Sequence, residues 1–189
     1  MLMWLAVSLA GCGINNIPTY DEQVKAAWSQ VQNQYQRRAD LVPNLVNTVQ
    51  GFADQEREVL VEVTEARSKV GAIQMDESIL NDPQKFQQFE QAQSQLGSAL
   101  QRLMVVVERY PDLKSNQNFL TLQAQLEGTE NRIAVARRDY IQAVQQYNTE
   151  IRTFPGRIWH SVLYSELEQR ENFEATTENA DQAPSVNFE

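Results

Sequence analysis

The sequence has 189 residues, the length of a single domain. Its 25 acidic residues outnumber the 16 basic ones, and a net charge of −9 would repel a phosphate backbone, so we expect no nucleic acid partner. With only 7 glycines and 6 prolines the chain has little turn chemistry, which is typical of long helices. The single cysteine cannot form a disulfide within the chain.

The first eleven residues, MLMWLAVSLAG, are apolar apart from Ser8. As a helix they would span ~16 Å, too little for a hydrocarbon core of ~30 Å, but they have the length of the apolar region of a signal peptide. No basic residue precedes them, because the first one is Lys25, so we expect the true start to lie further upstream. A longer leader could then be a transmembrane anchor, and that alternative stays open.

The leader ends in Leu9-Ala10-Gly11-Cys12, which resembles the lipobox of bacterial lipoproteins. The resemblance implies that Cys12 receives a diacylglyceryl group and becomes the N-terminus after cleavage, and more than one acyl chain gives a stable membrane anchor. The alternative is an inert buried thiol. We therefore predict a leader over 1–12 with Cys12 as the lipid attachment site, followed by a tether over 13–19.

The first helix is predicted to be very long. Thr19 and Glu22 have the spacing of a capping box, which places the helix start near Tyr20. From there apolar residues recur at steps of four and three as far as Ile73, a coiled-coil-like seam that predicts one helix over 20–73. Pro43 removes one helical hydrogen bond and predicts a kink. Gly51 is a second weak point.

Three further helices follow in the expected order. Asp82-Pro83 is a cap followed by proline at the first helical position, so the second helix should cover 84–110. A third helix should end before Pro155-Gly156, and a short fourth could follow. We expect a bundle over 20–168 and an acidic flexible tail over 169–189. The third helix carries an apolar or aromatic residue at every seventh position: Phe119, Leu126, Ile133, Tyr140, Tyr147 and Phe154.

These elements predict an all-α fold, an elongated antiparallel up-and-down helical bundle with a very long, Pro-kinked first helix. A helix over 20–73 would be ~80 Å long and its neighbour only ~40 Å, so the stem over 24–42 would expose an apolar seam. We therefore expect the first helix either to fold back at Pro43 or Gly51 and complete a four-helix bundle, or to pair with other copies of the chain through the stem.

Charged residues near the seams allow a polar network inside the bundle. In a continuous first helix Glu56 would lie on the seam, roughly level with residues 127–132 of the third helix, and a buried carboxylate needs a donor. Asn131 or Arg132 could donate to it, so the candidate structural network is Glu56, Glu127, Asn131 and Arg132. The alternative is that these clusters are solvated helix faces. The clusters comprise Arg37, Arg38 and Asp40 in one motif, and Glu127, Glu130, Asn131, Arg132, Arg137 and Arg138 in the other.

No arrangement of residues indicates a reaction. A di-iron site in a helical bundle needs a Glu-x-x-His pair on each of two helices, and the chain has one histidine, His160. No glycine-rich loop precedes a helix, and no nucleophile with a base is evident. We expect no catalytic, cofactor-binding or metal-binding residues.

The segments 27–52, 110–140 and 147–156, together with the closing FEA and APSVNF, closely resemble the LemA family of bacterial envelope proteins. The resemblance implies an antiparallel helical bundle outside the cytoplasm, tied to a membrane near its N-terminus, and it implies no enzymatic activity. Members usually carry a transmembrane helix at the N-terminus, so Cys12 is a departure. If the cell has two membranes, Gly13 beside the cysteine favours the outer membrane, with the bundle facing the periplasm.

The expected function is accordingly architectural. We expect a membrane-anchored, non-enzymatic scaffold or adaptor that contacts other envelope proteins. The alternative is an accessory or regulatory subunit of an envelope membrane enzyme such as a protease.

Overall fold

The computed structural model describes residues 13–173, and within that range the regular structure is entirely helical. This confirms the all-α fold. Residues 1–12, which include Cys12, and residues 174–189 lie outside the described part. The elements in chain order are α2 (Asn16–Gln50), α3 (Arg57–Ala72), the short 3-10 helix η1 (Glu77–Asn81), α4 (Pro83–Val107), α5 (Pro111–Lys114), α6 (Gln117–Arg152) and α7 (Gly156–Leu163).

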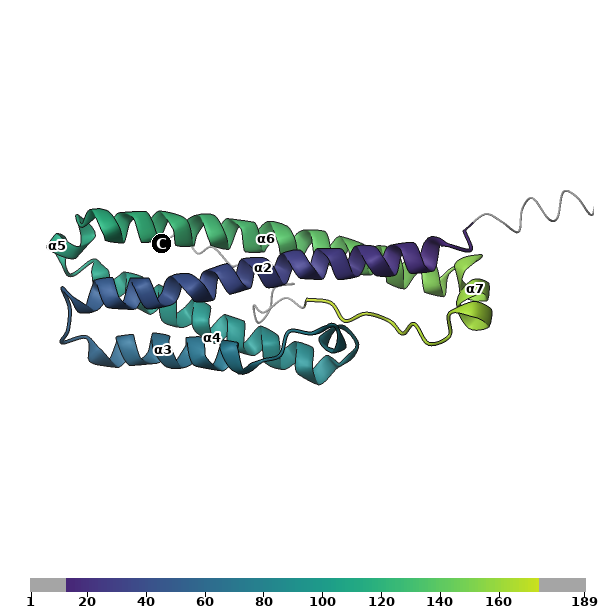
Figure 1. Ribbon diagram of the computed structural model, residues 1–189, viewed down its shortest axis with the longest axis horizontal. Helices are drawn as coiled ribbons and strands as arrows, with labels where there is room; N and C mark the ends of the chain where they lie inside the picture. Colours follow the sequence, from purple (N-terminus) through teal and green to yellow (C-terminus); the bar gives the residue numbers. More distant parts are fainter. Residues whose placement is uncertain (1–12, 174–189) are drawn as a thin grey trace, which may run out of the picture.

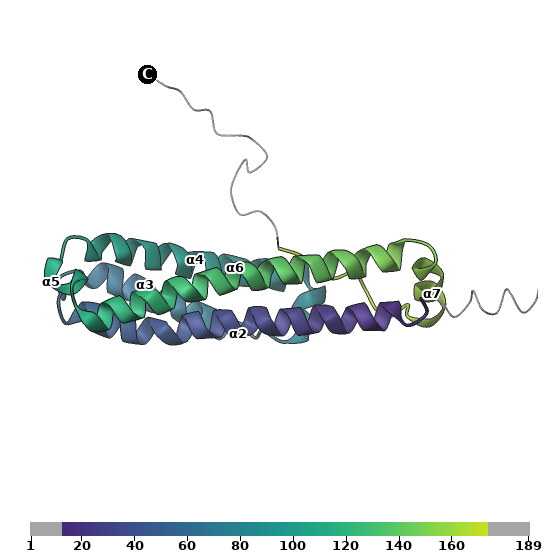
Figure 2. The ribbon, with the colours of Figure 1, turned by 90° about the horizontal axis from the view of Figure 1, so that it is seen from above.

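The bundle is built on two long antiparallel helices. At 1.5 Å per residue α2 is ~52 Å long and α6 is ~54 Å long, and they run side by side for their full length in both views (Figure 1, Figure 2). The shorter α3 and α4 pack against them at one end and make that half a four-helix bundle. We call this end, where α2 turns into α3 and α5 lies, the distal end. The other end carries α7 and the start of α2.

The segment predicted as one helix over 20–73 is two helices. α2 runs through Pro43 and ends at Gln50, and α3 begins at Arg57 and returns beside it. The fold-back at Gly51 is therefore confirmed. Glycine costs about 1 kcal/mol in a helix interior, and reversing the chain there lets the apolar face of α3 join the core.

The start of α2 differs from the prediction. The helix begins at Asn16, one turn before Tyr20, and the Thr19 hydroxyl donates to the backbone oxygen of Asn15 (2.7 Å) instead of capping. A threonine inside a helix can make this bond to the residue four positions earlier. Residues 16–19 therefore belong to the helix, and the tether predicted over 13–19 is too long.

The start of α4 follows the sequence signal. The carboxylate of Asp82 accepts hydrogen bonds from the backbone nitrogens of Gln84 (3.0 Å) and Lys85 (3.1 Å), and Pro83 is the first helical residue. Asp82 thus satisfies two of the nitrogens that a helix start leaves without partners.

The interior has two parts, an aliphatic core in the four-helix half and an aromatic core in the other half. The predicted stem over 24–42 lies largely in the aromatic core, where Trp28 is 2% exposed and Tyr35 is 3% exposed. The same chain covers them, so the expected exposed seam is wrong and pairing of copies through it loses its physical basis. The aromatic core contains Trp28, Tyr35, Phe86, Phe89, Tyr140 and Tyr147.

The chain after α7 completes the cover of the stem that α4 and α6 begin. Residues 164–173, here called the C-terminal segment, leave α7 and run back along the bundle without forming a helix (Figure 1). The hydroxyls of Tyr140 and Tyr147 donate to the backbone oxygens of Glu171 (2.7 Å) and Glu168 (2.9 Å). The predicted boundary at 168 is therefore too early, because residues 169–173 belong to the folded bundle.

Candidate functional site

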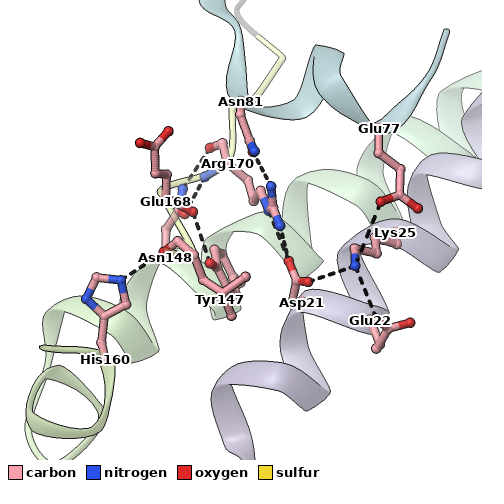
Figure 3. A network of polar contacts seen from close by, with 11 residues as sticks. Asp21, Glu22, Lys25, Glu77, Asn81, Tyr147, Asn148, His160, Glu168 and Arg170 are labelled. Atoms are coloured by element: carbon pink, nitrogen blue, oxygen red, sulfur yellow. Dashed lines mark hydrogen bonds and ion pairs between the residues drawn. The ribbon is translucent and has the colours of Figure 1, made fainter. Parts of the chain in front are cut away.

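The most extensive buried polar cluster holds the C-terminal segment to the bundle, and Arg170 is its centre (Figure 3). Arg170 Nε donates to Asp21 Oδ1 of α2 at 3.0 Å, and Nη1 donates to the Asn81 side chain of η1. The backbone of Arg170 exchanges two hydrogen bonds of 3.0 Å with the side chain of Asn148 on α6. One residue thus joins three elements that are distant in the sequence.

The two buried charges of this cluster belong to Asp21 and Arg170, and they pair with each other. The side chains of Asp21 and Arg170 are 5% and 6% exposed. Asp21 also contacts Lys25 Nζ at 3.1 Å, and Lys25 lies 3.2 Å from Glu22. The hydrogen bonds from Lys25 to Asp21 and Glu22 raise the pKa of Lys25 above its ordinary value. Lys25 therefore keeps its charge at neutral pH, and the ion pairs form a structural clamp.

The end of the C-terminal segment is held by aromatic packing. The ring of Phe173 lies 5.0 Å from that of Phe86 and 5.4 Å from that of Tyr140, and the guanidinium of Arg137 sits over it at 4.2 Å.

The two tyrosines that donate hydrogen bonds to the C-terminal segment stay protonated. Burial raises the pKa of Tyr147 to about 12 and also raises that of Tyr140. Both hydroxyls therefore remain protonated donors to the segment at neutral pH.

A second polar cluster lies between α2, α4 and α6. Arg38 is 4% exposed, and its guanidinium donates to the side-chain oxygen of Gln93 (2.5 Å) and to Glu130 (3.2 Å). A neighbouring ion pair joins Arg137 and Glu90 at 3.6 Å. These residues line a cavity of about 240 Å³. Because the two guanidiniums and two carboxylates neutralise each other, the cavity has no uncompensated charge to attract an ionic substrate.

The predicted network of Glu56, Glu127, Asn131 and Arg132 is not assembled in the structure. Glu56 precedes α3 in the distal turn and accepts hydrogen bonds from Tyr110 (2.9 Å) and Arg109 (3.1 Å). The prediction that Glu56 lies level with residues 127–132 assumed that the first helix is unbroken. Since the chain reverses after Gly51, Glu56 lies at the end of the bundle, beyond the reach of residues 131 and 132.

The other three members also have different neighbours. Glu127 accepts from Gln123 on its own helix (2.9 Å), Asn131 is exposed, and Arg132 donates to Gln34 (3.2 Å) and Thr129 (3.1 Å). The two charged motifs nevertheless do meet, through Arg38 and Glu130.

The clamp around Arg170 was missed at the sequence level, although two signals for it were present. Asp21 continues the seam spacing backwards from Val24 and Trp28, which marks it as an inward-facing position. Arg170 is the only basic residue in an acidic stretch that begins after Ser165. An acid on a buried seam together with a lone base elsewhere is the pattern of a buried ion pair.

Within residues 13–173 no three His, Cys, Asp or Glu side chains converge in a way that could hold a metal ion. None of the helices in that range is both long and apolar enough to cross a bilayer.

The single histidine of the sequence contacts the C-terminal segment. His160 Nε2 lies 2.8 Å from the backbone oxygen of Leu167.

The beginning of the described chain lies against the turn between α6 and α7. Asn16 Nδ2 donates to Glu150 Oε1 at 3.2 Å. A Cβ atom added to Gly13 would lie 3.9 Å from Pro155 Cγ. The residue that follows Cys12 in the sequence therefore sits beside that turn.

Comparison with known proteins supplies the family. The model of the LemA family matches residues 27–188, which include α2 from its fourth turn onward and every later element. The chain belongs to the LemA family. Neither the family description nor the names of the relatives that follow state a catalytic activity.

Relatives of this LemA-family chain occur in several bacteria. Magnetosome protein MamQ 2 of Paramagnetospirillum magneticum is 31% identical over 160 residues, which cover 75% of this chain and 58% of the relative. Protein LemA of Metamycoplasma hominis is 26% identical over 140 residues, 74% of this chain and 60% of the relative. Magnetosome protein MamQ of Magnetospirillum gryphiswaldense is 27% identical over 160 residues, with coverage of 75% and 58%. The match therefore spans about three fifths of each relative's length.

Proposed function

We propose that this LemA-family chain is a membrane-anchored, non-enzymatic helical scaffold or adaptor of the bacterial cell envelope. Its anchor is Cys12, acylated as the lipobox resemblance implies, and its bundle lies outside the cytoplasm. In a cell with two membranes the bundle faces the periplasm from the outer membrane. The family membership supports this proposal.

The observation that carries the proposal is that the described chain begins at one end of a long bundle, far from the distal end. α2 begins at Asn16, so the attachment site at Cys12 belongs to the end that carries α7. The distal end lies roughly 50 Å away, the length of α2. A rigid rod fixed at one end holds its other end at a set height above the membrane, which suits a scaffold.

The distal end offers apolar contacts to a partner. Phe52 is 43% exposed in the turn before α3, Leu120 is 42% exposed at the start of α6, and Val105 is 70% exposed near the end of α4. Apolar side chains left uncovered at the end of a rod are suited to contact another envelope protein.

The anchor is tested with Cys12→Ser in intact cells. We expect the wild-type chain in the membrane fraction and the variant in the soluble fraction, because the variant has no thiol to acylate. Metabolic labelling with a palmitate analogue should mark the wild type alone. Retention of the variant in the membrane would contradict the lipid anchor and favour a transmembrane leader.

The scaffold role is tested by placing a photo-crosslinking residue at Val105, with the same residue at Val135, which is 46% exposed on α6, as the matched control. Several envelope proteins captured from Val105 and not from Val135 would support a scaffold. One stoichiometric partner whose activity changes when this chain is deleted would instead identify an accessory subunit of a membrane enzyme, such as a protease.

The location of the bundle is tested by adding a protease to cells whose inner membrane is intact. The protease should digest the bundle if the bundle lies outside the cytoplasm.

A further inference from the structure

An apolar surface lies at the end of the bundle that is opposite to the distal end. Phe154 is 81% exposed and Val162 is 70% exposed, while Ile158 and Leu163 are each about half exposed. Residues 158 and 162 are four apart on α7 and share one side of that helix, and Phe154 lies in the turn that precedes it. Trp159 of the same helix packs instead against the aromatic core. We call the four exposed residues the α7 face.

The stretch that carries this face contains basic but no acidic residues, although Glu150 and Glu166 flank it. No acidic residue occurs between Ile151 and Ser165, although the chain has a net charge of −9. The same stretch contains Arg152 and Arg157, both exposed. Arginine stems can lie along apolar surface while their guanidiniums reach anionic headgroups.

The position of the α7 face connects it to the anchor. Pro155, which follows Phe154, is the neighbour of Gly13 described above. Cys12 directly precedes Gly13 in the sequence, and consecutive Cα atoms are about 3.8 Å apart. An anchor at Cys12 would therefore hold the α6–α7 turn at the surface of the bilayer. The same holds if a transmembrane leader replaces the acyl chains, since it too would end at this point.

We propose that the α7 face docks on the membrane and inserts its apolar side chains at the boundary between headgroups and acyl chains. This inference rests on the proposed anchoring near Cys12. Apolar residues on one helix face, flanked by arginine, are typical of segments that lie in the membrane interface. The docked face is a second contact beside the anchor, and it fixes the direction in which the bundle projects.

A bilayer suits this face better than a protein partner does. Stable protein interfaces engage about 20–30 residues on each side, far more than the α7 face supplies. A membrane surface requires no such area, because the neighbouring anchor already keeps the face at the lipid and makes its insertion an intramolecular event.

The test uses the full chain with Cys12→Ser, which removes the acyl chains and keeps the leader in every variant. Partition onto vesicles of phosphatidylglycerol and phosphatidylethanolamine is measured by co-sedimentation. Phe154→Ser with Val162→Ser should lower the partition coefficient roughly a hundredfold, the effect expected from losing two inserted side chains. Val61→Ser with Val135→Ser, which are also exposed, should leave it unchanged. Equal partition of the two double variants would overturn the proposal.

A second measurement separates this inference from the anchor itself. In the acylated chain reconstituted in vesicles, the amides of residues 154–163 should exchange more slowly than in the lipid-free Cys12→Ser chain. The Phe154→Ser, Val162→Ser variant should remain in the membrane fraction but lose that protection. Concentration-dependent protection without lipid would show that a second copy covers the face, which would overturn the proposal. Retention of Cys12→Ser in the cell membrane would contradict the lipid anchor but not the docking of the α7 face.

Discussion

The side chain of Arg170 is paired with that of Asp21, 149 residues earlier in the sequence, with Nε 3.0 Å from Oδ1. Both side chains are buried. The pair fastens the C-terminal segment to the first turns of α2, and the segment in turn completes the aromatic core. Contacts between the two ends of the described chain thus take the place that a longer α3 would fill in a regular four-helix bundle.

Removal of either partner of this pair should have unequal effects. Asp21→Asn leaves the buried guanidinium of Arg170 without its carboxylate, and breaking a buried pair costs roughly 3–5 kcal/mol. Arg170→Met should cost less, because Asp21 keeps Lys25 as an ion partner at 3.1 Å. Urea unfolding of both variants measures the difference in the free energy of unfolding.

Two comparisons check that explanation. The exposed pair of Arg138 and Asp139 provides a control, and Asp139→Asn should change the free energy of unfolding by less than about 0.5 kcal/mol. The double variant Asp21→Leu with Arg170→Met should recover part of the loss seen with Asp21→Asn. A loss for Arg170→Met as large as that for Asp21→Asn would show that the unpaired charge is not the cause.

Phe173→Ala should destabilise the bundle although it lies near the end of the described chain. Its ring contacts Trp28, Phe86 and Tyr140, and each aromatic pair contributes about 0.5–1.5 kcal/mol beyond the area that it buries. We expect a loss of about 2–3 kcal/mol and faster exchange of the amides around Trp28. Phe154→Ala, at a position 81% exposed, is the matched control and should leave the melting temperature unchanged. Equal melting temperatures would contradict a packing role for Phe173.

Gly156→Ala should disturb the turn between α6 and α7. A Cβ atom at this position would lie 2.2 Å from the backbone oxygen of Glu150, which is closer than any real contact, so the backbone would have to move. Overpacking of this kind costs about 1–3 kcal/mol. Gly71→Ala is the control, since a Cβ there meets nothing within 4 Å, and it should be neutral or stabilising. Thermal unfolding of the two variants checks the difference, and similar melting temperatures would refute it.

Alkaline pH should loosen the C-terminal segment. An unfolded tyrosine has a pKa of about 10, whereas burial raises the pKa of Tyr147 to about 12. The stability that depends on this neutral hydroxyl is therefore complete below about pH 10 and is lost as the pH rises through about 12. Urea unfolding at several pH values should show the decline, and Tyr147→Phe should show a smaller one. Tyrosinate absorbance from the folded chain close to pH 10 for every tyrosine would contradict this expectation.

The helices themselves were predictable because their signals are local. The seam from Val24 to Val49, the cap at Asp82 and the heptad spacing of Phe119 to Tyr147 each act within a few turns of one helix. The same kind of signal marked Gly51 as a weak point. It did not decide whether the chain would reverse there, because a glycine inside a helix costs only about 1 kcal/mol and tertiary packing overrides that.

By itself the sequence determined which stretches are helical and which residues face inward. Only the tertiary structure decided that α3 folds back at Gly51, that Glu56 meets Tyr110 and that Arg170 meets Asp21. The reason is that helix formation follows from contacts three and four residues apart, whereas polar partners on different helices depend on where each turn falls. A reversal of the chain moves every later residue to a new level.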